Sequence, residues 1–142
     1  MKVQAYLAFR GNCQQALEYY SEILNADIIN RQTYYDNDTN VPSSFGHKLQ
    51  HAELKGRHLL LMAYDISANT PLKPGNQIHM SAELNDMEEA AHVFSELSSG
   101  GQVHHTFMEW EWGYFGRCTD KFGINWMVKC NHQLSIPSNY IM

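Results

Sequence analysis

Hydrophobic and polar residues alternate along residues 3–9, the pattern of a strand with one buried face made of Val3, Ala5, Leu7 and Phe9. Asn12 then stands where a helix N-cap belongs, and Gln15 three residues later is expected to complete a capping box. The spacing changes to that of a helix, whose apolar stripe comprises Ala16, Leu17, Tyr20, Ile23 and Leu24. Three strand-like segments follow, at residues 28–35, 45–55 and 58–65.

The same order recurs after residues 67–76, a segment with two prolines and one glycine that is typical of a linker. Residues 77–84 alternate, with Ile78, Met80, Ala82 and Leu84 facing inward, and Asn85 or Asp86 is placed to cap a helix. The expected apolar stripe of that helix comprises Met87, Ala90, Ala91, Phe94 and Leu97. Three further strands are predicted at 102–109, 112–119 and 124–130.

This internal repeat predicts an α+β chain built from two βαβββ modules, residues 1–66 and 77–131, within one domain that spans residues 1–132. Residues 133–142 are expected to be a C-terminal tail. If the two sheets join edge to edge, they form a curved, half-open, eight-stranded mixed sheet. The interior of such a sheet is lined by the strand faces that the helices do not cover.

Charge and cysteine usage narrow the classes of function. The net charge is −5 and no basic cluster occurs, so we expect no nucleic-acid partner. No apolar run approaches the length of a membrane span, so we expect no membrane partner. The three cysteines are an odd number without a CxxC pair, which favours a reduced, cytoplasmic protein with structural thiols.

Residues 109–126 combine all three tryptophans with three glycines. In an extended chain Trp110 and Trp112 face the same side, and we interpret them as an aromatic lid on a small-molecule cavity. The alternative is a dimer interface, where aromatic residues are also enriched. Asp120 and Gly123 are expected to form the tight turn that closes the last hairpin.

Three segments carry a resemblance to a known family: AYLAFRGNCQQALEYYSEIL at 5–24, QHAELKGRHLLLMAYD at 50–65 and WGYFGRCTDKFGINWMVK at 112–129. The chain resembles the PhnB-like branch of the glyoxalase, bleomycin-resistance and extradiol-dioxygenase superfamily, also called the vicinal oxygen chelate superfamily. The resemblance covers about residues 2–130 and implies a glyoxalase-like fold.

In that superfamily four interior side chains hold a divalent metal, and the matching positions here are Gln4, Met62 (or Leu61), His79 and Met127. This donor set is one amide, one imidazole and two thioethers, which suits neither a hard nor a borderline divalent ion. We therefore expect no metal cofactor. The alternatives are a weakly held divalent ion at His79, or His51 substituting for a missing ligand.

Two functions stay open, and the sequence does not decide whether the protein is an enzyme. The first is a metal-independent enzyme acting on a small metabolite, with His79 as the acid or base and with Gln4 and Tyr6 orienting the ligand. The second is a protein that binds or sequesters a small molecule, as bleomycin-resistance members of the superfamily do. In either case the expected ligand-binding residues are Gln4, Tyr6, His51, Met62, Trp110, Trp112 and Met127.

Two further expectations concern the site. Part of the branch carries a demethylubiquinone methyltransferase name, which the sequence does not support because no glycine-rich loop follows a strand to hold a nucleoside cofactor. His104 and His105 are adjacent on a predicted strand and are expected to point to opposite faces, so at most one of them contributes to a site.

We predict a twofold homodimer, because the free edges of two four-stranded sheets need cover and the aromatic second half offers apolar surface. Sedimentation velocity at micromolar concentration is expected to show the mass of two chains. A single species with the mass of one chain would contradict this prediction.

Overall fold

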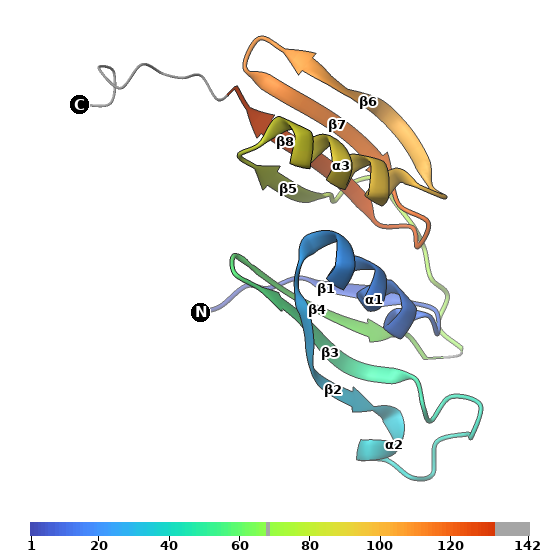
Figure 1. Cartoon of the computed structure of the whole chain (residues 1–142). Helices are drawn as coiled ribbons and strands as arrows, with labels where there is room; N and C mark the ends of the chain where they lie inside the picture. The colour runs from blue at the N-terminus through green and yellow to red at the C-terminus, as the bar shows by residue number, and fades with distance from the viewer. Residues whose placement is uncertain (68, 133–142) are drawn as a thin grey trace. The chain divides into compact units, whose positions relative to one another are not determined.

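The computed structural model describes residues 1–67 and 69–132 of the chain (Figure 1). The chain divides into two compact units, Met1–Lys73 and Pro74–Met142, and the boundary falls inside the predicted linker. The predicted tail at 133–142 lies outside the described residues. Each unit is described by itself below.

The first unit contains one four-stranded sheet and two helices. Its elements in chain order are β1 (Tyr6–Phe9), α1 (Cys13–Leu24), β2 (Asp27–Thr33), α2 (Tyr34–Asn37), β3 (Leu49–Gly56) and β4 (Leu59–Asp65). The strand order is β1-β4-β3-β2, with β1 parallel to β4 and the other pairs antiparallel.

The second unit repeats this plan. Its elements are β5 (Met80–Leu84), α3 (Met87–Ser98), β6 (Gln102–Trp110), β7 (Gly113–Thr119) and β8 (Asn125–Asn131). The strand order is β5-β8-β7-β6, again with one parallel pair, β5 and β8. The predicted α+β class and the βαβββ repeat are confirmed, and the hydrogen-bonded strands form two sheets of four.

Each long helix covers one face of its own sheet, as Figure 1 shows for α1 and for α3. The buried residues of α1 are Cys13, Ala16, Leu17 and Tyr20, and those of α3 are Ala90, Val93, Phe94 and Leu97. Alternate strand residues complete the two cores, among them Phe9, Leu54, Leu61, Cys118, Trp126 and Val128. On the opposite face of each sheet, no helix of the same unit is present among the described residues, and we call this face the open face of that sheet.

The predicted inward faces are correct within the strands and wrong just before them. Leu7 and Phe9 are buried, whereas Val3 is 87% exposed. Met80 is half-buried, whereas Ile78 is 79% exposed. Val3 and Ile78 precede the first paired residues of β1 and β5. The apolar–polar alternation therefore extends in the sequence beyond the residues that pair with a neighbouring strand. Met87, expected on the buried stripe of α3, is also exposed.

The start of α1 differs from the predicted capping box. Asn12 is the N-cap, but its side chain makes no capping hydrogen bond. The cap comes instead from Asp65 at the end of β4, whose Oδ1 accepts from the backbone N–H of Cys13 at 3.0 Å. Its Oδ2 accepts from the N–H of Leu49 at 2.9 Å, and its carbonyl accepts from the hydroxyl of Tyr34 at 2.6 Å.

The predicted strand at 28–35 ends two residues early, because a second capping motif intervenes. The hydroxyl of Thr33 accepts from the N–H of Asp36, and the Asp36 carboxylate accepts from the N–H of Thr33. This reciprocal pair begins the short helix α2, whose first two residues had been predicted as strand. At α3 the predicted cap is confirmed, since the carboxylate of Asp86 accepts from the N–H of Glu89 at 2.9 Å.

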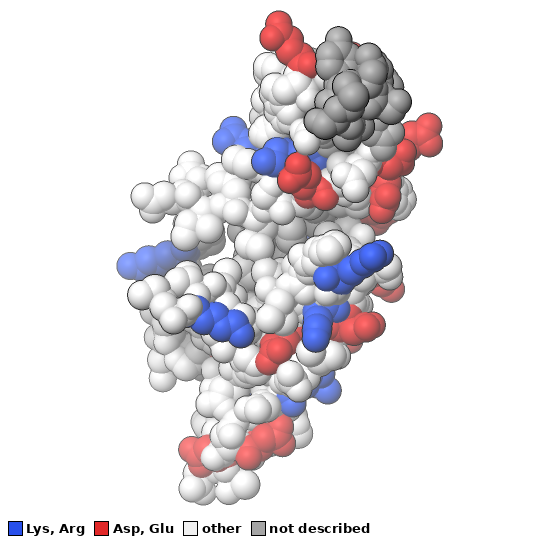
Figure 2. Space-filling view, turned by 90° about the vertical axis from the view of Figure 1, so that its left-hand side faces the viewer, with Lys and Arg blue, Asp and Glu red and all other residues white. Residues whose placement is uncertain are grey.

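Lys and Arg side chains are interspersed with Asp and Glu on the face shown in Figure 2. None of the helices in the described ranges has the length and apolar character needed to cross a membrane.

All three cysteines are buried free thiols, as the sequence analysis expected. Burial, followed by the negative charge of Asp65, raises the pKa of the Cys13 thiol to about 12. Burial, followed by the charge of Asp120, raises the pKa of Cys118 to about 11. The position of Cys13 at a helix N-terminus therefore does not make it a nucleophile.

We predict that replacing Asp65 with Ala lowers the free energy of unfolding by about 2–4 kcal/mol, because two buried backbone N–H groups lose their acceptor. Urea denaturation followed by circular dichroism measures the change. Asp27→Ala, which removes an exposed carboxylate from β2, is the matched control and is expected to cost less than about 0.5 kcal/mol. Equal costs for the two variants would contradict the capping role.

We also predict that iodoacetamide at pH 8.5 leaves all three cysteines unmodified in the native protein, because their high pKa values and burial keep thiolate scarce. Intact-mass spectrometry after denaturation in guanidinium chloride is expected to show three adducts. A rapid single adduct on the native protein would show a reactive thiol and contradict the prediction.

Candidate functional site

The open face of the first sheet carries a hydrogen-bonded chain of three side chains. The hydroxyl of Tyr6 lies 3.0 Å from Nδ1 of His51, and Nε2 of His51 lies 2.8 Å from Oε2 of Glu53. Tyr6 is 54% exposed, while the His51 and Glu53 side chains are each 22% exposed. The exposed end of the chain is therefore the phenol, and the carboxylate is its more enclosed end.

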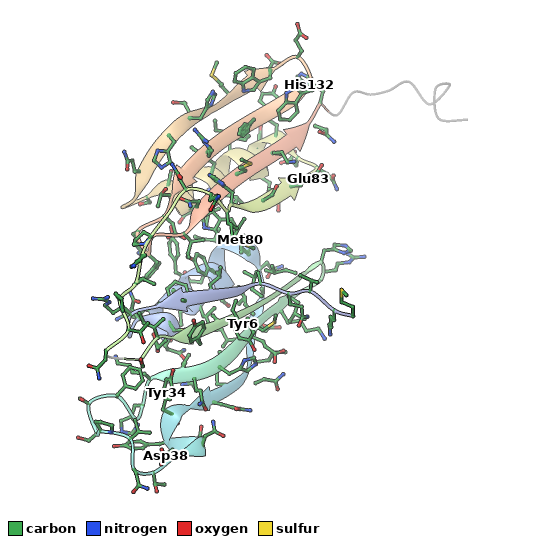
Figure 3. The ribbon with its side chains drawn as sticks, turned by 180° about the vertical axis from the view of Figure 1, so that it is seen from behind. Tyr6, Tyr34, Asp38, Met80, Glu83 and His132 are labelled. Carbon is green, nitrogen blue, oxygen red and sulfur yellow. The ribbon has the colours of Figure 1, made fainter. Side chains whose placement is uncertain are left out.

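Strand register brings these residues together. Tyr6 on β1 and Glu53 on β3 both pair with Met62 on the intervening strand β4. Because residues opposite each other in a sheet share a face, all three project from the open face. Met62 lies between the other two and is buried. Figure 3 views this sheet from the side opposite α1 and labels Tyr6.

The ionisation of Glu53 determines where the protons lie in the hydrogen-bonded series Tyr6–His51–Glu53. Its hydrogen bond with His51, and then one with the Asn30 side chain, lowers the pKa of Glu53 below its usual value. Asn30 has a positive φ of 54° at an irregularity in the pairing of β2. With Glu53 ionised, His51 donates from Nε2, so its Nδ1 is free to accept the hydrogen bond of the Tyr6 hydroxyl.

The open face of the second sheet is hollowed at one end by a depression of about 400 Å³. Its walls come from residues 74–76, from Gly123 and from five polar side chains: His79, His104, Arg117, Thr119 and Asn125. None of these lining residues is acidic. No carboxylate within residues 1–67 and 69–132 forms an ion pair with Arg117.

A hydrogen-bond network fixes the wall of this hollow. Nε2 of His104 lies 2.7 Å from the Thr119 hydroxyl, which donates to Oδ1 of Asn125 at 2.8 Å. Because that hydroxyl proton is engaged, His104 is the donor to Thr119. The amide of Asn125 donates in turn to the carbonyls of Gly75 and Ile78, at 2.6 and 3.1 Å. The network thus holds the segment before β5 against β8.

The expectation that His104 and His105 face opposite sides was wrong, because β6 is irregular at this point. Val103 pairs with Cys118, and the next pair is His105 with Arg117. Between these two pairs β6 has one residue, His104, that has no pairing partner on β7. Such a bulge leaves one residue extra and turns neighbouring side chains to the same side. His104 consequently bonds Thr119, while the ring of His105 lies 5.6 Å from that of Phe115.

Four rings form a continuous cluster beside the hollow. His105 contacts Trp110 at 5.2 Å and Phe115 at 5.6 Å between ring centroids, and Trp112 contacts Phe115 at 6.2 Å. Trp110 and Trp112 are 43% and 48% exposed. We call His105, Trp110, Trp112 and Phe115 the ring cluster.

The chain does not run extended through the two tryptophans, as had been expected. Trp110 pairs with Gly113, so Glu111 and Trp112 form a two-residue hairpin turn. Gly116 serves packing on the other face of the sheet, since a Cβ there would lie 2.7 Å from Cε1 of Phe94.

The turn that closes the last hairpin is as predicted. Gly123 has a φ of 92°. Oδ1 of Asp120 accepts from the N–H groups of Phe122 and Ile124 at 2.8 and 3.0 Å. Oδ2 of Asp120 also accepts from the indole N–H of Trp126 at 2.8 Å, a contact that the sequence analysis missed.

The predicted site residues fall into two groups. Tyr6, His51 and Met62 share the open face of the first sheet, and Gln4 lies exposed just before β1. Met127 pairs with Arg117 on the open face of the second sheet, and His79 lines the hollow there. Glu53, His104, Arg117, Thr119 and Asn125 were not predicted as site residues. Strand alternation alone would have placed Arg117 on the same face as Phe115 and Met127.

The metal positions that the resemblance implies do not fit a divalent ion chemically. Gln4 offers a neutral amide oxygen, Met62 and Met127 offer thioethers, and only His79 is a common ligand. Within residues 1–67 and 69–132, no three His, Cys, Asp or Glu side chains are grouped closely enough to hold a metal.

Comparisons with known proteins agree with the motifs. Residues 1–129 match the family described as 3-demethylubiquinone-9 3-methyltransferase. Protein YjdN of Escherichia coli (strain K12) is 26% identical over 140 residues, covering 90% of this chain and 94% of that protein. The crystal structure of PA1353 from Pseudomonas aeruginosa is 30% identical, with a TM-score of 0.80 over 92% of this chain and 98% of that one.

More distant structures share the fold. A PhnB protein from Bacillus cereus is 22% identical with a TM-score of 0.75, covering 92% of this chain and 99% of that one. A glyoxylase/bleomycin resistance protein/dioxygenase domain from Frankia sp. EAN1pec is 16% identical with a TM-score of 0.61, covering 93% and 98%. The chain therefore belongs to the family described as 3-demethylubiquinone-9 3-methyltransferase, and it shares its fold with the PhnB and glyoxylase/bleomycin resistance protein/dioxygenase structures.

Proposed function

We propose that the protein is a metal-independent acid–base enzyme that acts on a small metabolite, with Tyr6 as the group that exchanges a proton with the ligand. The observation that carries this proposal is the chain of hydrogen bonds from Tyr6 through His51 to Glu53. A reactive group held by a base, which is itself oriented by a third group, is the arrangement that activates weak side-chain acids in enzymes.

The proton steps follow from the donor assignments above. Tyr6 takes a proton from an acidic C–H or O–H of the ligand while its own proton passes to Nδ1 of His51. The resulting imidazolium is stabilised by the Glu53 carboxylate, and the phenol stays neutral. The reverse transfer returns the proton to another atom of the same ligand, so an isomerisation is balanced without any co-reactant.

His79, the base expected from the sequence, has no proton-transfer role in this proposal; it lies in the second unit, whereas Tyr6 lies in the first. No hydrogen bond of the described residues orients its ring, whereas His51 has a partner at each nitrogen. A histidine ring with a hydrogen-bond partner at each nitrogen is held in one orientation and one tautomer. His79 stays a predicted catalytic residue until the two positions are compared by substitution.

The methyltransferase activity in the family's description is not part of this proposal. Methyl transfer needs a bound methyl donor, and the sequence has no glycine-rich loop of the nucleoside-binding type after a strand.

A second candidate function is binding without turnover, as in the bleomycin-resistance proteins. The ring cluster favours it, because exposed aromatic rings offer stacking surface that needs no acid or base. The two candidates predict different consequences when the Tyr6 hydroxyl is removed.

We predict that Tyr6→Phe lowers the kcat/KM of a substrate found by thermal-shift screening by about 10²–10⁴-fold, because the ring stays and only the proton-transfer group is lost. The measurement is proton exchange or isomerisation of the ligand in D₂O, followed by NMR, before and after treatment with EDTA. Wild-type turnover is expected to survive EDTA.

Tyr64→Phe is the matched control, since the Tyr64 ring lies 5.9 Å from that of Tyr6 and its hydroxyl is outside the hydrogen-bonded chain. It is expected to change kcat/KM by less than about threefold. Turnover that persists in Tyr6→Phe but is lost in His79→Ala would move the catalytic role to His79. Ligands that bind the wild-type protein without ever being turned over would establish the binding function instead.

A further inference from the structure

We infer that the open face of the second sheet binds a small planar aromatic carboxylate, with its anionic group in the hollow at Arg117 and its ring against the ring cluster. This inference goes beyond the proposed proton transfer, because it concerns the open face of the second sheet alone and does not require Tyr6. Both halves of the predicted site lie within the second unit.

The hollow has the donor chemistry of a carboxylate site. Arg117 contributes a guanidinium, whose planar fork matches the two oxygens of a carboxylate, and no described carboxylate competes for it. His79 and His104 line the same hollow, and no acidic side chain among its lining residues would repel an anion. A cation in a concave site without carboxylates favours a small anion over a neutral ligand.

The wall of the hollow is already organised before any ligand arrives. A series of hydrogen bonds runs from His104 to Thr119 and from Thr119 to Asn125. The Asn125 amide also donates to the carbonyls of Gly75 and Ile78. These side chains therefore lose little further freedom on binding, which leaves more of the contact energy for affinity. Arg117 lies beside this network and forms no ion pair within residues 1–67 and 69–132.

The ring cluster begins next to Arg117. His105 pairs with Arg117 across β6 and β7, and its ring contacts Phe115, two residues before Arg117 on the same strand. Residues two apart on a strand are separated by roughly 6.5–7 Å, which is about the span from a carboxylate to the far side of its attached aromatic ring. Trp110 and Trp112 widen the stacking surface and are exposed.

The three tryptophans supply an internal control for a binding experiment. Trp110 and Trp112 belong to the ring cluster, whereas Trp126 is buried and its indole N–H is bonded to Asp120. The test is a titration of the ¹⁵N-labelled full chain with 2-naphthoate, in which NMR follows the three indole N–H signals. The signals of Trp110 and Trp112 are expected to shift with one common Kd, and that of Trp126 is expected to stay in place.

Two related compounds separate the halves of the ligand. 2-Naphthylmethanol keeps the ring without the charge, and cyclohexanecarboxylate keeps the charge without the aromatic ring. Both are expected to bind at least about fivefold more weakly than 2-naphthoate, because each loses one set of contacts. Equal affinity for 2-naphthylmethanol would overturn the carboxylate assignment, and equal affinity for cyclohexanecarboxylate would overturn the stacking role.

Arg117→Gln is expected to weaken 2-naphthoate binding by about 10- to 100-fold, the range for a lost hydrogen bond to a charged group. Lys129→Gln is the matched control, because Lys129 pairs with Phe115 on the same face yet does not line the hollow. Its Kd is expected to change less than about threefold. Arg117→Lys keeps the charge and loses the fork, so it provides a second test should Arg117→Gln fold poorly.

An unchanged Kd in both Arg117 variants, or a larger loss in Lys129→Gln, would overturn the inference. A shift of Trp126 alone would place the ligand in the core and would also overturn it. The titration reads binding by the second unit and uses no variant of Tyr6, which belongs to the first unit. A failure of this binding test is therefore separate from a failure of the proposed proton transfer.

Discussion

Each four-stranded sheet has one long helix with which to bury its apolar side chains, and this constraint determines where chemistry is possible. A helix covers only one sheet face, so alternate strand residues enter a core while the others remain on an uncovered surface. In the first unit that surface holds Tyr6, His51 and Glu53, and in the second it holds Arg117 and the ring cluster. The polar side chains that could react or bind are therefore those that the helices leave uncovered.

Much of this arrangement was predictable from local patterns. Alternation within strands identified Leu7 and Phe9 as buried, and the turn at Asp120 and Gly123 followed from residue type alone. These features depend on a few neighbouring residues. The sequence also places Tyr6 on the open face by parity, because Leu7 and Phe9 enter the core.

The features that escaped prediction depend on register or on distant segments. The cap of α1 comes from Asp65, which is 52 residues from Cys13 in sequence, so no local capping motif predicts it. The bulge in β6 changes the sheet face on which His104 lies. Two adjacent histidines in a sequence do not indicate that the pairing with the neighbouring strand skips a residue there. The bond between Tyr6 and His51 needs β4 to separate their strands, which only the sheet order supplies.

The aromatic residues are divided unevenly between the two units, and this gives each unit its own optical signal. All three tryptophans lie in the second unit, while six of the eight tyrosines lie in residues 1–73. Tryptophan emission therefore reports on the second unit, with Trp126 as its buried fluorophore and Trp110 and Trp112 as solvent-exposed ones. The first unit is visible through tyrosine absorbance and near-ultraviolet dichroism. One sample thus carries two spectroscopic channels, from which cooperative and stepwise unfolding of the two halves of the repeat can be told apart.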